Sequence, residues 1–115
     1  RFSQKRLNRV LDYIEAHLDR NLGVKELARV GSASTWHFGK LFKYSTGQTL
    51  HQYVLHRRIE RAKQLLRNDR NTIAQVALSV GLTNQSHFTM MFRKQVGMTP
   101  KVFRVCSSTG RQLSR

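Results

Sequence analysis

The stretch HFTMMFRKQVG, residues 87–97, repeats the frame of an earlier stretch, HFGKLFKYSTG, residues 37–47. Both read H-F-x-x-x-F-[KR]-x-x-x-G, and His87 follows His37 by 50 positions. Phenylalanines four residues apart share one helix face, so each stretch predicts an amphipathic helix that buries its aromatic pair. The closing glycine is a typical helix terminator. The chain therefore repeats a scaffold while changing the residues in its variable positions.

Each copy extends upstream into a second, shorter helix. The apolar pattern of residues 24–30 recurs in residues 73–79 at an offset of 49, with Val24 and Leu27 expected to face inward. Ala28 and Ala77 stand where the two helices of each copy would meet, and a small residue there permits close approach. A short helix, a turn and a longer helix make the helix-turn-helix plan, whose second helix enters the DNA major groove.

The remaining segments also predict helices, and none shows strand alternation, so the chain is expected to be all-α with about seven helices. The expected helices lie at about 3–18, 24–30, 35–45, 49–67, 73–79 and 84–95, with a last short one from Thr99-Pro100 to about 104. The expected N-caps are Ser3, Ser34, Thr72 and Thr83, and Gln75 is placed to complete a capping box. The predicted organisation is a first helix-turn-helix subdomain at 1–48, a long linking helix at 49–67, a second subdomain at 68–104 and a disordered tail at 105–115.

The charge of the chain favours a polyanionic partner. There are 21 Lys and Arg against 6 Asp and Glu, a formal net charge of +15, and residues 27–59 and 70–115 contain no acid. Cys106 is the single cysteine, which excludes a disulfide framework and a cysteine-based metal site. The histidines show no convincing metal-ligand spacing. No apolar run approaches a membrane span, and Arg1 in place of Met indicates a fragment of a longer protein.

The exposed stripes of the two repeated helices differ in chemistry. In the first frame the face opposite the phenylalanines carries Trp36, Gly39, Lys40 and Lys43; in the second it carries Ser86, Thr89, Met90 and Arg93, with Gln85 at the start. One scaffold with two different outer stripes is how a reader of two different short DNA sequences would be built.

Each candidate contact has an alternative. Lys40 could reach guanine O6 or N7, or a phosphate, and Gln85 could pair with adenine or contact a phosphate. Trp36 could pack on sugars or a thymine methyl, or be a partly buried aromatic that anchors the turn. Thr89 and Met90 could contact thymine methyls or simply be exposed.

The chain resembles the DNA-binding domain of the AraC/XylS family of bacterial transcription regulators over about residues 3–104. The resemblance rests on IAQVALSVGLTNQSHFTMMFRKQVGMTPKVFR, on the upstream unit VKELARVGSASTWHFGKLFKYSTG and on YVLHRRIERAKQLL, which is similar to the family's linking helix. It implies two recognition helices in successive major-groove segments, about 34 Å or roughly 10 bp apart. Three departures are Ser32 at the usual turn glycine, Gly39, which offers no side chain to a base, and Met90 where Arg is common.

The resemblance also carries residue roles and partners. The implied base-reading positions are Trp36, Gly39, Lys40, Gln85, Ser86, Thr89 and Met90. The expected phosphate contacts are Ser34, Thr35, Lys43, Arg57, Arg58, Thr83, Arg93, Lys94 and Lys101. The implied partners are double-stranded DNA and RNA polymerase, in an activator that works at the nucleoid in the bacterial cytoplasm, with an effector or dimerisation domain upstream of the fragment.

No cofactor is expected, and no motif indicates an enzyme. The main alternative is a nonspecific basic nucleic-acid-binding module, which charge alone would support. It lacks the aromatic platforms of single-strand binders, and the repeated helix-turn-helix argues against it. A basic amphipathic membrane binder would need exposed apolar faces, whereas these helices are expected to pair into two small cores.

Overall fold

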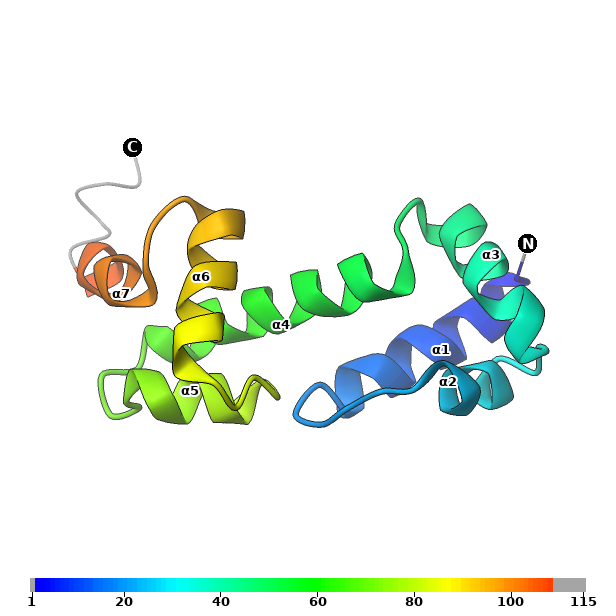
Figure 1. The fold of residues 1–115 in the computed structure, drawn as a ribbon, viewed down its shortest axis with the longest axis horizontal. Helices are drawn as coiled ribbons and strands as arrows, with labels where there is room; N and C mark the ends of the chain where they lie inside the picture. The colour runs from blue at the N-terminus through cyan, green and yellow to red at the C-terminus, as the bar shows by residue number, and fades with distance from the viewer. Residues whose placement is uncertain (1, 109–115) are drawn as a thin grey trace. The chain divides into compact units, whose positions relative to one another are not determined.

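The computed structural model describes residues 2–108, and that range contains seven α-helices and no strand, so the predicted all-α class is confirmed (Figure 1). The helices are α1 (Gln4–Ala16), α2 (Val24–Val30), α3 (Thr35–Thr46), α4 (Leu50–Leu66), α5 (Ile73–Ser79), α6 (Gln85–Val96) and α7 (Pro100–Ser108). The chain divides into two compact units, Arg1–Arg57 and Arg58–Arg115, and the division falls within α4. Each unit contains one helix-turn-helix pair, α2–α3 in the first and α5–α6 in the second.

The helix starts follow the expected capping chemistry at three of four positions. Ser3 and Ser34 each accept a hydrogen bond from the third residue of their helix. Thr72 and Gln75 form a complete capping box, in which each side chain accepts from the other residue's backbone N–H at 3.0 and 2.8 Å. The prediction for Thr83 was wrong, because Asn84 is the last extended residue before α6 and its Oδ1 accepts from His87 N at 3.0 Å.

The first unit packs α1, α2 and α3 around an aromatic chain. The ring centroids of Phe2 and Phe38 are 5.7 Å apart, those of Phe38 and Phe42 are 5.8 Å apart, and Tyr53 of α4 meets Phe42 edge-on at 5.4 Å. The buried residues of this core are Phe2, Val10, Ile14, Leu18, Leu27, Ala28, Phe38 and Phe42. Val24, expected to face inward, is 43% exposed because it starts α2 at the rim of the core.

In the second unit the phenylalanine pair of α6 is joined by an aromatic residue of α7. Phe88 and Phe92 of α6 are buried with centroids 5.8 Å apart, and Phe103 of α7 meets Phe92 edge-on at 5.6 Å. The other buried hydrophobic residues of this unit are Ile59, Ala62, Leu66, Val76, Ala77, Val80 and Leu82. Both predicted phenylalanine pairs are therefore core, and they fix which face of α3 and α6 is left outside.

The turns within the two helix-turn-helix pairs have the same hydrogen bond. Ala33 N donates to Ala28 O, and Leu82 N donates to Ala77 O, both at 2.9 Å. Ala28 and Ala77 are 2% and 1% exposed, as expected for small residues at a close helix contact.

Arg6 of α1 forms hydrogen bonds with the turn between α2 and α3. Its Nε donates to Gly31 O and its Nη2 to Ser32 O, each at 2.9 Å. A Cβ at Gly31 would lie 3.0 Å from Val10 Cγ2 and 3.3 Å from Phe2 Cε1, so a larger residue there would require these side chains to shift. Residues of α1 and Phe2 just before it therefore contact this turn directly.

The last helix is longer than predicted. The expectation of a disordered tail from residue 105 was wrong for residues 105–108, which continue α7 to Ser108. Phe103 anchors the helix to the core, and Arg104 donates to Leu66 O at 2.8 Å and Asn68 O at 3.2 Å. The two Arg104 hydrogen bonds join residues 38 and 36 positions apart, so local periodicity does not reveal them. The remainder of the expected tail, 109–115, lies outside the described residues.

A polar cluster joins the end of α1 to α2. Glu26 accepts hydrogen bonds from Arg20 and from the Tyr13 hydroxyl, and Arg20 Nη2 also reaches the Tyr13 hydroxyl at 3.1 Å. The hydrogen bond from Arg20, followed by that from Tyr13, lowers the pKa of Glu26 to about 2. The same contact with Glu26 raises the pKa of Tyr13.

Candidate nucleic-acid interface

The orientation of α3 is set by its ends and its inner face. Ser34 caps the start, and the N–H of Gly47 bonds to Lys43 O at 2.7 Å at the end. Gly47 has a left-handed φ of 82°, the conformation that favours glycine after a helix. With Phe38 and Phe42 fully buried, Gly39 and Lys40 between them are left exposed, while Leu41 packs partly buried against the core.

The outer face of α3 combines aromatic rings with cations. Trp36 is 77% exposed, which excludes the alternative that it is a buried anchor of the turn. The Nζ of Lys40 lies 5.8 Å from the centroid of the Trp36 ring, within reach of a cation–π attraction. An open hollow on this face is lined by Gly39, Lys40, Lys43 and Tyr44. The structure thus gathers the predicted residues of this helix and adds Tyr44, which is 68% exposed.

Tyr44 was missed by the sequence analysis, although a signal was present. It follows Lys40 by four residues and so continues the stripe of exposed residues by one helical turn.

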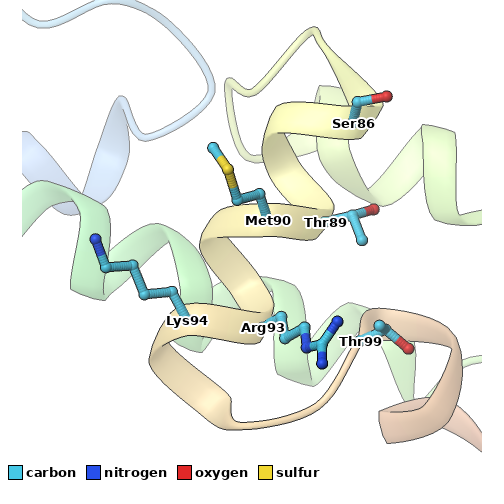
Figure 2. Close-up of a pocket in the computed structure, with 6 residues that line it drawn as sticks. All are labelled: Ser86, Thr89, Met90, Arg93, Lys94 and Thr99. Carbon is cyan, nitrogen blue, oxygen red and sulfur yellow. The ribbon is translucent and has the colours of Figure 1, made fainter.

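The outer face of α6 exposes no Trp, Tyr or Phe side chain in its hollows. Figure 2 shows a groove lined by residues of this helix and by one residue just before α7, with Met90 and Lys94 extending on one side of α6 and Thr89 and Arg93 on the other. The lining residues are Ser86, Thr89, Met90, Arg93, Lys94 and Thr99. Gln85 joins Ser86 and Thr89 in an adjoining hollow at the start of the helix. Met90 is 58% exposed, so its side chain is available for contact.

The two hollows are lined by equivalent positions of the repeated frame. With an offset of 50, Gly39 corresponds to Thr89, and Lys40 corresponds to Met90. The same offset pairs Lys43 with Arg93 and Tyr44 with Lys94. The scaffold therefore presents four equivalent positions twice and fills them with different residues on α3 and on α6.

The predicted phosphate contacts divide into two groups. Ser34, Thr35, Lys43, Thr83, Arg93 and Lys94 are exposed on or beside the two outer faces. Arg57 and Arg58 of α4 and Lys101 of α7 line none of these hollows. Arg57 forms a bidentate ion pair with Glu15 at 3.0 and 3.4 Å, so part of its charge is already satisfied within the first unit.

The two outer faces are positive because the acidic residues lie on other elements. Neither α3 nor α6 contains an acidic residue. Glu26, Glu15 and Glu60 are engaged with Arg20, Arg57 and Lys63 on other elements. The positive field of Lys40, Lys43, Arg93 and Lys94 is thus not interrupted by a carboxylate on the same helix.

The histidines at the start of each frame serve the caps. The Oγ of Ser34 lies 3.0 Å from His37 Nδ1, and the backbone N–H of His87 is bound by Asn84. Over residues 2–108 no three His, Cys, Asp or Glu side chains come together as they would around a metal ion. Within the same range no helix has the length and apolar character needed to cross a bilayer.

Comparisons with known proteins agree with this geometry. A family model described as a helix-turn-helix domain matches residues 27–105. The probable transcriptional regulator LumQ of Photobacterium leiognathi is 43% identical over 98 residues, which are 84% of this chain and 40% of LumQ. The chain thus spans less than half the length of that relative.

Two solved structures share the fold over nearly their whole length. A transcriptional regulator from Chromobacterium violaceum, described as having an AraC-type DNA-binding domain, superposes with a TM-score of 0.83 at 28% identity, covering 90% of this chain and 93% of that one. The DNA-binding domain of AdpA, a global transcriptional factor solved in complex with a target DNA, gives a TM-score of 0.84 at 25% identity, covering 92% and 96%.

Proposed function

This chain belongs to the AraC family of helix-turn-helix DNA-binding transcription regulators, which are not enzymes, and from that premise we propose how it reads its DNA. The helices α3 and α6 enter two successive major-groove segments on one face of the duplex, about 34 Å or roughly 10 bp apart. Their buried phenylalanines hold them in the two units, and their outer stripes face the base edges.

One observation carries this proposal: the hollows on α3 and α6 are lined by equivalent positions that hold different residues. A nonspecific binder gains nothing from two different faces on one scaffold, because phosphates are the same along the duplex. A reader of a bipartite sequence needs such a difference, since each half of its site is a different set of base edges.

The chemistry of each face supports a division of base contacts. In this proposal Lys40, which lies beside the Trp36 ring, contacts guanine O6 or N7, and Trp36 packs on sugars or a thymine methyl. On α6, Gln85 suits the N6 and N7 atoms of adenine, while Thr89 and Met90 suit thymine methyls. Ser86 is a small polar neighbour that either strand's bases can approach.

The remaining predicted residues supply affinity and register. Lys43, Arg93 and Lys94 flank the two hollows and neutralise phosphates beside the bases that are read. Ser34, Thr35 and Thr83 add contacts where the recognition helices begin, where backbone N–H groups favour an anion. Arg57, Arg58 and Lys101 contribute from α4 and α7.

The regulatory output is a further part of the proposal. The family resemblance supports activation by contact with RNA polymerase, at the nucleoid in the bacterial cytoplasm. An upstream effector or dimerisation domain accords with the greater length of LumQ. Transcription with purified polymerase from a promoter bearing the selected site tests activation directly: a decrease in transcript on adding the protein contradicts it.

Selection of binding sites from a random duplex library at physiological salt tests the proposed recognition. The expected product is one asymmetric motif with two blocks about 10 bp apart. Binding without enrichment of any motif would identify a nonspecific basic module, the alternative that the charge of +15 favours.

A further inference from the structure

Gly39 is a glycine that the fold does not require. Within residues 2–108 it is the single glycine in a helix interior, because Gly23, Gly31, Gly47, Gly81 and Gly97 lie at helix ends and turns. A Cβ added at Gly39 meets nothing within 4 Å, and its φ is not left-handed. By contrast, Gly31 has Val10 against it and Gly47 has a φ of 82°. Glycine weakens a helix interior relative to alanine, so Gly39 destabilises α3. Neither its backbone conformation nor its neighbours require a glycine there.

The place of Gly39 in the outer face indicates what the missing side chain leaves room for. Gly39 lines the open hollow together with Lys40, Lys43 and Tyr44. The equivalent position in α6 is Thr89, whose side chain lines the corresponding groove (Figure 2). A ligand in the α3 hollow can therefore approach the helix backbone more closely than one in the α6 groove.

The chemistry of that hollow at Gly39 is apolar. The residue has no side-chain donor or acceptor, and its backbone N–H is used by the carbonyl one helical turn earlier. A polar base atom placed against it would lose its water without gaining a partner. In the major groove the apolar group on a base edge is the 5-methyl of thymine.

We propose that the hollow at Gly39 receives the 5-methyl group of a thymine, so that Gly39 determines specificity by having no side chain. The inference rests on the proposed function, since it requires α3 to enter the major groove. Lys40 and Lys43 also line this hollow. Their ammonium groups bind neighbouring polar atoms or phosphates, and the methyl group lies against Gly39.

The test compares Gly39→Ala with a matched control, Gly23→Ala. Both substitutions add one methyl group to an exposed position with open space around it, but Gly23 is the N-cap of α2 and lies on neither outer face. Affinities are measured for the motif selected by the wild-type chain, and for duplexes in which each thymine of the two blocks is replaced in turn by deoxyuridine. Thermal unfolding confirms that both variants remain folded.

The expected result has three parts. Deoxyuridine at one position weakens the wild-type protein about fourfold, the value of one buried methyl group. Gly39→Ala binds the selected duplex more weakly while unfolding at the same or a higher temperature, and it no longer distinguishes thymine from deoxyuridine at that position. Gly23→Ala retains the wild-type preference.

Two results overturn the assignment of the thymine methyl group to Gly39, and a third overturns the proposed function as well. Unchanged affinity of Gly39→Ala shows that no ligand approaches position 39. A loss that is equal for the thymine and deoxyuridine duplexes shows a clash with another group of the DNA. A wild-type chain that selects no motif overturns the proposed function itself, and the assignment with it, which separates the two failures.

Discussion

Ser32 and Gly81 occupy equivalent positions in the two helix-turn-helix turns, and both have left-handed backbones, with φ of 54° and 80°. Ser32 is the one residue other than glycine with a positive φ within residues 2–108. The first unit thus keeps the turn geometry of the second without the residue that best adopts it. Arg6 bonds the carbonyls of Gly31 and Ser32, and it compensates for part of the resulting strain.

Replacing Ser32 with Gly should stabilise the first unit. A residue with a Cβ loses about 1–2 kcal/mol in the left-handed region, and the greater freedom of glycine in the unfolded chain returns part of this gain. We expect the free energy of unfolding in urea to rise by about 0.5–1 kcal/mol. Gly81→Ala is the matched control and should lower it; a loss of stability in Ser32→Gly would contradict the strain account.

Removing the Arg6 guanidinium should destabilise the same turn. Arg6→Ala leaves two carbonyl groups without their charged donor, and we expect a loss of about 1–3 kcal/mol in the free energy of unfolding. Arg6→Lys keeps the charge but loses the two-pronged geometry, so it should fall between. Arg9→Ala, an exposed position on the same helix, is the control and should change little. Equal effects of Arg6→Ala and Arg9→Ala would show that the turn does not depend on this contact.

The stability of the first unit should depend on pH through the ionisation of Glu26. The unfolded chain binds a proton at Glu26 near pH 4.5 and the folded chain near 2, so stability rises with pH across this window. The contribution is complete above the unfolded value and is lost as pH falls towards about 2. Chemical unfolding of wild type and Glu26→Gln from pH 7 to pH 2 should therefore show a gap that narrows in acid. Tyr13→Phe should remove part of the gap, and a gap that persists unchanged at pH 2 would contradict the assignment.

Alanine substitutions of Lys40 and Lys43 should distinguish a base-reading residue from a phosphate-binding one. Lys40→Ala should cost about 1–3 kcal/mol on the selected duplex and relax the preference at one base position. Lys43→Ala, one turn along the same helix, should weaken all sequences alike and reduce the salt slope by about 1. A uniform loss in Lys40→Ala would show that Lys40 binds a phosphate, and the guanine contact would have to be abandoned.

Most of the fold was predictable because its signals are local. The phenylalanine pairs four residues apart, the closing glycines and the Thr72–Gln75 capping box lie within single turns of helix. What could not be predicted depends on contacts between distant residues, such as Arg6 with Ser32 and Arg104 with Leu66. Neighbouring Thr83 and Asn84 are both good caps, and only the backbone geometry decides between them.

The candidate interface was predictable in its positions and less so in its chemistry. Spacing alone placed Trp36, Gly39 and Lys40 on the face opposite the core, and the structure confirms their exposure. The spacing in the sequence could not show that Lys40 lies against the Trp36 ring or that Tyr44 extends the face, since rotamers and groove shape depend on packing.

The most direct test of the account exchanges one outer stripe for the other. The triple variant Trp36→Ser, Gly39→Thr, Lys40→Met gives α3 the residues that α6 has at the equivalent exposed positions. Site selection with this folded variant should change one block of the motif towards the sequence of the other block and leave the second block as it is in the wild-type motif. A variant that is folded and selects the unchanged wild-type motif would contradict the claim that α3 and α6 each read their own half of the site.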